Sequence, residues 1–159
     1  MSIDKAKKYL ESKGFLDRVI EVEQSSATVD LAAQALGVEP GMIAKTLSFI
    51  LPDGPILILV EGTAKVDNHK FKEAFRTKAK MIPREEVAGF IGHEPGGVCP
   101  FGINEGVRVY LDESLKKYDT VYPAAGNDHS AVRLSLPELE ECSGALGWVD
   151  VCKEPAPEA

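Results

Sequence analysis

The segment Ala44–Glu61, AKTLSFILPDGPILILVE, decides the fold. Pro52-Asp53-Gly54 separates two apolar halves and is typical of a tight turn, so the segment predicts a hairpin of strands 44–51 and 55–61. The second strand contains Ile56-Leu57-Ile58-Leu59-Val60, a run without a polar residue. Because a strand with one solvated face alternates polar and apolar residues, this run predicts a central strand covered on both faces by helices. The segment therefore predicts an α/β layer architecture.

Helical and strand patterns surround the hairpin. A helix is predicted at 3–13, after a Ser2 cap and before Gly14, and another between Ser25 or Ser26 and Gly37. The later elements expected are a helix 68–76 capped by Asp67, a helix after Pro83, strands at 107–111, 120–123, 131–135 and 148–151, and a Pro137-led helix to Cys142. The pattern predicts one α/β domain over residues 1–152, a mixed, mostly antiparallel sheet flanked by helices, and a frayed tail at 153–159.

Length and composition exclude several protein classes. The chain has 159 residues, of which 44% are apolar and 27% charged, so a second full domain does not fit. The cysteines Cys99, Cys142 and Cys152 are odd in number and lack C-x-x-C spacing, which disfavours a disulfide framework and a cysteine zinc site. No apolar run approaches the roughly 20 residues of a membrane helix, and no signal peptide is evident. We expect a cytoplasmic protein without metal or cofactor.

Charge is distributed unevenly along the chain. The net charge is −7, which argues against indiscriminate binding to nucleic acid. Residues 65–84, however, contain seven Lys and Arg against only Asp67 and Glu73. This segment predicts a basic face, and the alternative is an ordinary solvated helix surface.

The segment 92–106, GHEPGGVCPFGINEG, predicts a shaped loop because it holds five glycines and two prolines. Within it, Gly96-Gly97-Val98-Cys99-Pro100-Phe101-Gly102 can direct backbone amides at an anion or oxyanion. It matches neither the Walker pattern nor the dinucleotide Gly-x-Gly-x-x-Gly fingerprint. A glycine-rich turn without a ligand is the alternative.

Two further side chains stand out. Lys45 interrupts an otherwise apolar strand, which costs free energy unless the ammonium reaches water or an anion. An edge-strand lysine facing water is the alternative. His129 lies in the polar run 127–130, but neither it nor His69 or His93 has metal-ligand spacing.

Several of these motifs together carry a family resemblance. They are Ser25-Ser26-Ala27-Thr28, Ala32-Ala33, Leu36-Gly37, Ile43-Ala44-Lys45-Thr46-Leu47 and the 96–102 loop. In this order the chain resembles the YbaK/ProX family of aminoacyl-tRNA deacylases over nearly its whole length. The family's members are free-standing proteins or an editing domain inserted in bacterial prolyl-tRNA synthetases, with a mixed sheet flanked by helices. The resemblance implies hydrolysis of misacylated tRNA carrying a small amino acid, with tRNA-Pro as a candidate, and prolyl-tRNA synthetase as a candidate partner.

The resemblance also implies roles for individual positions. Lys45, Gly96 and Gly97 are the implied catalytic residues, Lys45 at the tRNA end or the ester and the glycines around the carbonyl. The implied substrate-binding residues are Thr28, Val98, Cys99, Pro100, Phe101, Gly102, Gly126 and His129. The basic segment implies tRNA contacts at Lys70, Lys72, Arg76 and Lys80. Relatives commonly have serine at position 99 and a different 127–130 segment, so the amino acid that is removed stays open.

Three functions are compatible with these residues. In the deacylase hypothesis no strong general base is needed, because the ribose 2′-hydroxyl is thought to assist water in this family and loop amides stabilise the oxyanion. The second hypothesis is a tRNA or small-molecule binding module of the same fold without turnover. The third is a hydrolase with a Cys99 nucleophile and His129 as its base. Candidate pocket walls are Val29, Met42, Phe49, Val98 and Phe101, and the oligomeric state is not predicted.

Overall fold

The computed structural model describes residues 2–153, so that of the predicted tail at 153–159 only Lys153 lies inside the described residues. The α-helices in this range are α1 (Ser2–Lys13), α2 (Val29–Leu36), α3 (Asn68–Phe75), α4 (Arg84–Ile91) and α5 (Leu136–Ser143). The strands are β1 (Val19–Glu21), β2 (Ile43–Leu51), β3 (Gly54–Glu61), β4 (Arg108–Asp112), β5 (Thr120–Pro123), β6 (Ser130–Val132), β7 (Leu134–Ser135) and β8 (Trp148–Val149). Short 3-10 helices lie at η1 (Leu16–Arg18), η2 (Pro40–Met42) and η3 (Glu113–Lys117). No described helix has the length and apolar character needed to span a membrane.

The central hairpin is confirmed. Strands β2 and β3 pair antiparallel from Ala44↔Glu61 to Leu51↔Gly54. Gly54 closes the turn with φ 127°, a backbone conformation that L side chains rarely adopt. The hairpin therefore forms the longest ladder of the sheet and sets its register.

The hairpin lies inside a six-stranded sheet with the order β7-β5-β2-β3-β4-β8. The β2–β3 and β5–β7 pairs are antiparallel, whereas β2–β5, β3–β4 and β4–β8 are parallel. The mixed sheet is confirmed, with more parallel pairs than expected because β3 and β4 are joined by a long crossover that contains α3 and α4. A separate antiparallel pair, β1–β6, lies beside the sheet.

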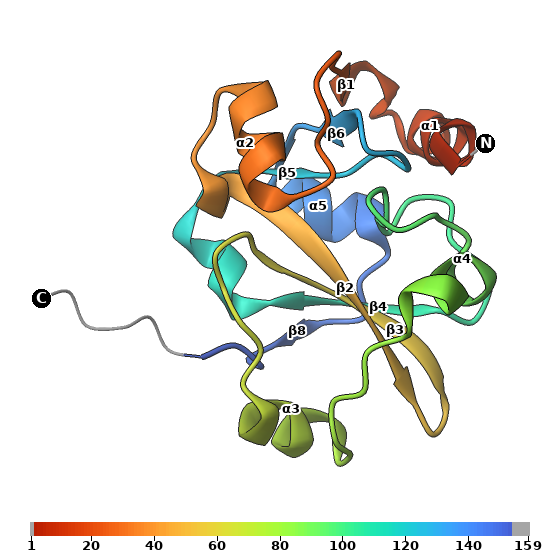
Figure 1. The fold of residues 1–159 in the computed structure, drawn as a ribbon, viewed down its shortest axis with the longest axis vertical. Helices are drawn as coiled ribbons and strands as arrows, with labels where there is room; N and C mark the ends of the chain where they lie inside the picture. The colour runs from red at the N-terminus through yellow and green to blue at the C-terminus, as the bar shows by residue number, and fades with distance from the viewer. Residues whose placement is uncertain (1, 154–159) are drawn as a thin grey trace, which may run out of the picture.

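Helices cover both faces of the sheet (Figure 1). Ile56 to Val60 have no exposed surface, as the uninterrupted apolar run predicted. Leu57 and Leu59 belong to the larger core, to which α1, α4 and α5 contribute. Ile56, Ile58 and Val60 face a second core, which α3 closes with Phe71. Because successive strand residues point to opposite faces, one apolar run supplies both cores.

Several predicted caps and breaks are confirmed. The Asp67 side chain accepts a hydrogen bond from the Lys70 amide at the start of α3. Pro83 precedes α4, Gly37 ends α2 with φ 70°, and 92–106 contains no helix or strand. Turn chemistry in the sequence thus located most element ends.

Three predicted boundaries are wrong. Thr28, not Ser25 or Ser26, caps α2, because its hydroxyl accepts from the Leu31 amide at 3.2 Å. The segment 131–135 is not one strand, because the chain leaves β1 at Arg133 and then pairs with β5. The last strand ends at Val149. The short strand β1 has no counterpart in the prediction.

Candidate functional site

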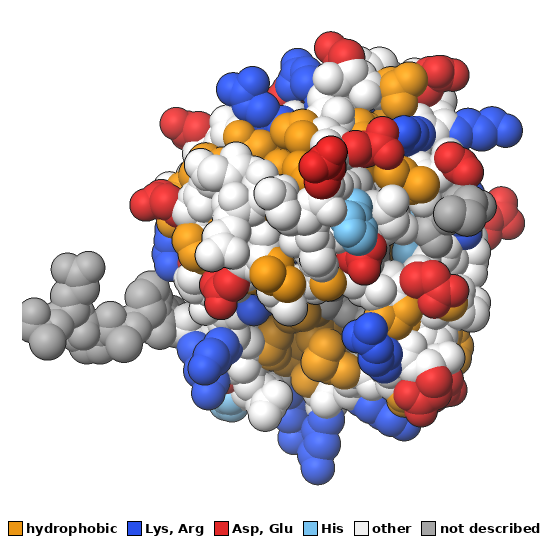
Figure 2. Space-filling model, turned by 45° about the horizontal axis from the view of Figure 1, so that its top comes forward, with side chains coloured by type: hydrophobic (Ala, Val, Ile, Leu, Met, Phe, Trp, Pro, Cys, Tyr) orange, Lys and Arg blue, Asp and Glu red, His pale blue; other side chains and the backbone are white. Residues whose placement is uncertain are grey.

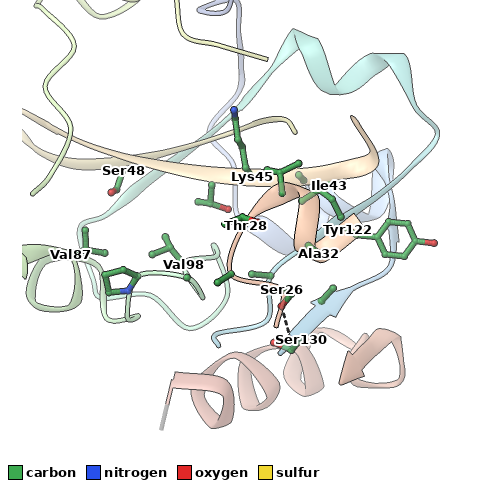
Figure 3. A pocket seen from close by; sticks show the side chains of 18 of the residues that line it. Ser26, Thr28, Ala32, Ile43, Lys45, Ser48, Val87, Val98, Tyr122 and Ser130 are labelled. Atoms are coloured by element: carbon green, nitrogen blue, oxygen red, sulfur yellow. Dashed lines mark hydrogen bonds between the residues drawn. The ribbon is translucent and has the colours of Figure 1, made fainter. Parts of the chain in front are cut away.

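The candidate site is a cavity of about 330 Å³ beside β2, here called the β2 pocket. It lies where β2, the start of α2, the 95–98 loop and the start of β6 meet (Figure 3). Residues that line it include Ser26, Thr28, Val29, Ile43, Lys45, Thr46, Ser48, Met81, Ile82, Arg84, Val87, Gly96, Val98, Tyr122 and Ser130. The pocket therefore combines an apolar wall with hydroxyl groups and two cationic side chains.

Lys45 lies at the edge of the pocket. Its side chain extends from β2 in the direction away from Thr28 and Val98 (Figure 3). The ammonium donates a hydrogen bond to the Ala64 carbonyl at 2.6 Å. Since Lys45 is half-buried, its ammonium donates to a carbonyl and β2 lies inside the sheet order, the alternative of an edge-strand lysine facing water is wrong. Burial lowers the pKa of the Lys45 ammonium, and the nearby Glu61 carboxylate opposes that shift.

A buried carboxylate fixes the carbonyl that holds Lys45. Glu61 is 1% exposed and accepts hydrogen bonds from the Thr63 amide and hydroxyl and, at 3.1 Å, from Lys117 Nζ. The Ala64 amide in turn donates to the Glu61 carbonyl at 2.9 Å. Burial raises the pKa of Glu61, but the bonds from Thr63 and Lys117 outweigh burial and leave this pKa below its ordinary value. Glu61 therefore stays ionised and anchors the turn that receives Lys45.

The glycine loop contributes a Pro-Gly turn to the opposite wall. The Gly97 amide donates to the Glu94 carbonyl at 3.1 Å, and Gly96 has φ 91°, the arrangement of a type II turn with Pro95 at its second position. Gly96 and Val98 line the pocket. Neither of their amides donates a hydrogen bond to another described residue. The two amides are therefore available to a ligand, whereas the Gly97 amide is used inside the turn.

Gly97 and Gly126 lie where two loops touch. A Cβ on Gly97 would meet the Asn127 nitrogen, the Asn127 Cα and the Gly126 carbonyl carbon at 2.5 Å each. Gly126 itself has φ 101° and is buried. Glycine at these positions lets the two loops pack backbone to backbone beside the pocket.

Cys99 and Phe101 have no exposed surface and belong to the larger core. The Cys99 thiol lies 3.5 Å from His93 Nε2, and that nitrogen lies 2.6 Å from the Phe101 carbonyl. Burial raises the pKa of the Cys99 thiol to about 12, and burial lowers the pKa of His93. The thiol is thus protonated at neutral pH and enclosed, which disfavours the nucleophile hypothesis. The histidine beside it is His93, not His129.

Pro100 and Gly102 also lie behind the pocket wall. Pro100 is buried, and Gly102 has φ 72° with its Cα so close to α1 that a Cβ would meet the Lys5 carbonyl at 2.7 Å. Neither residue lines the β2 pocket. The part of the loop after Val98 therefore fixes its shape, and substrate contact by these residues stays a prediction.

Thr28 lies at the outer part of the β2 pocket, and His129 lies outside it. Thr28 lines the pocket, but its hydroxyl is used as the cap of α2. His129 is exposed, with Nδ1 2.7 Å from an Asp128 carboxylate oxygen, and it does not line the pocket. The next residue, Ser130, does, and its amide donates to Ser26 Oγ at 3.2 Å. This hydrogen bond joins the two chain segments, around Ser26 and around Ser130, that form the outer wall of the pocket (Figure 3).

Comparison with known proteins assigns the family. Residues 23–142 match the family described as the aminoacyl-tRNA editing domain. The chain belongs to the aminoacyl-tRNA editing domain family. YwhH of Bacillus subtilis (strain 168), an uncharacterized protein, is 50% identical over 137 residues, covering 86% of this chain and 87% of YwhH. Proline–tRNA ligase of the same organism is 31% identical over 128 residues, which cover 79% of this chain but 21% of the ligase.

Solved structures agree with this assignment. A protein proposed to be a trans-editing enzyme for prolyl-tRNA synthetase superposes with a TM-score of 0.87 and 34% identity, over 96% of this chain and 98% of that one. A hypothetical protein, APE2540, superposes with a TM-score of 0.84 and 25% identity. The family resemblance and the fold predicted from the sequence are both confirmed.

The basic segment of this editing domain runs from α3 to the pocket rim. Lys72, Arg76 and Lys80 are exposed, whereas Lys70 is half-buried and pairs with Asp150 at 3.1 Å. Helix α3 packs on the face of the sheet opposite α4, and Arg84 at the other end of the segment lines the pocket. Figure 2 shows a hollow lined by hydrophobic side chains with Lys and Arg side chains around its lower rim.

Sequence reasoning placed some wall residues correctly and missed others. Val29 and Val98 line the pocket, but Met42, Phe49 and Phe101 do not, and Phe49 packs on Phe71 in the second core with ring centroids 4.8 Å apart. The polar lining residues that were not predicted as site residues are Ser26, Thr46, Ser48, Arg84, Tyr122 and Ser130. Thr46 and Ser48 alternate along β2, and this period of two was the available signal. No Asp or Glu is among the described lining residues, and the described residues contain no cluster that could hold a metal.

Proposed function

We propose that this editing domain hydrolyses the ester bond of misacylated tRNA that carries a small amino acid. Water adds to the ester carbonyl carbon, and the bond from that carbon to the ribose oxygen breaks. The products are the free amino acid and a tRNA with its terminal hydroxyl restored. tRNA-Pro is the first tRNA to test, because proline–tRNA ligases contain a segment that is similar to this chain.

The observation that carries the proposal is the pairing of two features on the β2 pocket. Lys45 supplies a cation at one edge, suited to the anionic tRNA end, and the Gly96 and Val98 amides stand unbonded at the other wall. Amides directed at a developing oxyanion and accurate placement of the ester supply several kcal/mol. An aminoacyl ester is already activated, so this help is enough without a triad. Gly97 acts through the shape of the turn, since its amide is bonded to Glu94.

The proposed biological setting follows from the substrate. A synthetase pocket discriminates amino acids that differ by one methylene only about 10- to 200-fold, so a second, size-selecting site removes the errors. Misacylated tRNA is then the partner, prolyl-tRNA synthetase the source of the substrate, and the cytoplasm the compartment.

The test is a deacylation screen with purified protein and tRNAs charged with alanine, cysteine, serine or proline. We expect faster hydrolysis of at least one small misacylated tRNA than in buffer. Lys45→Ala should lower that rate by about 10²-fold or more, and Lys45→Arg should not restore it, since a planar fork replaces a compact ammonium. Lys116→Ala is the matched control, because Lys116 is exposed and pairs with Glu113 outside the β2 pocket. Binding of tRNA without hydrolysis of any substrate would favour the binding-module hypothesis instead.

A further inference from the structure

One residue of β2 lacks a neighbour on one edge of the strand. On this edge β5 pairs with β2 at residues 43–44, and the segment 80–82 pairs with β2 around Phe49. Thr46 lies between the two pairings. This edge of β2 is therefore unpaired, or open, at Thr46, and the same residue lines the β2 pocket.

The hydrogen bonds on either side show which way the backbone of Thr46 faces. The Ser48 carbonyl accepts from the Ile82 amide at 3.1 Å, and the Ile50 amide donates to the Lys80 carbonyl at 2.9 Å. Because alternate residues of a strand direct their backbone groups to the same edge, the N–H and C=O of Thr46 face this edge as well. No described strand pairs with them there.

The side chain of Thr46 is also unpartnered. Among the described residues, Thr46 Oγ1 is enclosed and forms no hydrogen bond. Buried hydroxyls nearly always have a partner, and an orphan is costly, so its persistence at a pocket wall calls for an explanation. Rotation of the Thr46 side chain by about 120° about its Cα–Cβ bond, from one staggered rotamer to the next, moves the hydroxyl to the position that the methyl group or the hydrogen occupied, so that the hydroxyl can turn toward the pocket.

The ligand group that fits Thr46 is a hydrogen-bond donor. An aminoacyl ester presents its side chain, its carbonyl and its α-amino group, and only the amino group needs acceptors. With no Asp or Glu among the described lining residues, those acceptors must be neutral oxygens. The Ser26 hydroxyl accepts from the Ser130 amide and the Thr28 hydroxyl from the Leu31 amide. Thr46 offers two unused acceptors, its carbonyl and its hydroxyl.

We propose that Thr46 binds the α-amino group of the aminoacyl ester through its carbonyl at the open β2 edge and through its hydroxyl. The proposal rests on the proposed function and adds a substrate requirement to it. The protein acts on aminoacyl-tRNA with a free amino group and rejects N-acylated aminoacyl-tRNA, because the amide nitrogen of the acylated substrate is uncharged and has only one N–H left to donate.

The test compares alanyl-tRNA-Pro with N-acetylalanyl-tRNA-Pro as substrates of wild type and Thr46→Val. Valine keeps the shape and the backbone groups and removes the hydroxyl. We expect wild type to hydrolyse the acetylated substrate at least about 10²-fold more slowly. Thr46→Val should hydrolyse the substrate with a free amino group about tenfold more slowly than wild type does, and the acetylated substrate at the wild-type rate. Its melting temperature should equal or exceed that of wild type, because an orphan hydroxyl is gone, which separates binding from a structural role.

Thr120→Val is the control, since Thr120 lies on β5 and does not line the pocket. Equal wild-type rates on the two substrates would overturn the amino-group proposal and leave the proposed function standing. An equal loss on both substrates in Thr46→Val would overturn the assignment to Thr46. A wild-type protein that hydrolyses none of the screened aminoacyl-tRNAs would overturn the proposed function and, with it, this proposal.

Discussion

The contact between the glycine loop and the 126–127 loop makes Gly97→Ala the most informative backbone perturbation. The new Cβ would lie 2.5 Å from three backbone atoms of Gly126 and Asn127. Ordinary contact begins at 3.4 Å, so the loops must separate by nearly 1 Å. Backbone atoms cannot relieve the clash by a change of rotamer, as a flexible side chain can. Overpacking of this kind costs about 1–3 kcal/mol of unfolding free energy. A shift of this size beside the substrate costs about 10²-fold in rate.

Urea unfolding and single-turnover deacylation measure the two effects of Gly97→Ala. The control is Gly89→Ala on α4, where a Cβ meets nothing within 4 Å. Alanine there should raise the unfolding free energy by about 0.5–1 kcal/mol, since glycine is a poor helix residue, and leave the rate unchanged. Wild-type stability and rate in Gly97→Ala would refute the argument that glycine is required for the approach of the loops.

Three further outcomes are expected. Charge reversal of the exposed basic residues Lys72, Arg76 and Lys80 should weaken tRNA binding and reduce the slope of log affinity against log salt concentration by up to about three. Titrations at several salt concentrations measure this slope, and an unchanged slope would make the segment a solvated helix surface. Cys99→Ser should keep activity within about tenfold, and a 10³-fold loss together with a thioester seen by mass spectrometry would restore the nucleophile hypothesis. The Arg18 hydrogen bond holds the pKa of Glu138 at about 2 instead of 4.5. In urea unfolding, Glu138→Gln should therefore lower the unfolding free energy fully above pH 4.5, and the difference from wild type should vanish toward pH 2. A difference that does not depend on pH would contradict this.

Local signals in the sequence were sufficient for most of the fold. The run Ile56 to Val60 predicted a strand buried on both faces, and a two-faced α/β sheet follows because each face needs a helical cover. Asp67, Pro83 and Gly37 marked helix ends through capping and backbone preferences, which act within a few residues. The cap of α2 was misplaced because Ser25, Ser26 and Thr28 are chemically equivalent candidates. They are distinguished by the bond from the Ser130 amide to Ser26 and by the bond from the Leu31 amide to Thr28, both of which depend on the folded backbone.

The pocket itself was decided by tertiary structure. Sequence motifs singled out Lys45 and the 96–102 loop. They did not show that Cys99 and Phe101 turn into the core while Gly96 and Val98 line the pocket. The open edge at Thr46 exists because the pairing of β5 with β2 ends at Ala44, and a segment more than thirty residues along the chain resumes the pairing near Phe49. A strand's own residues determine its faces through the period of two. Which of its edges is paired, and over how many residues, depends on distant segments. The sequence therefore determined the sheet and its two cores, and only the assembled fold created the β2 pocket.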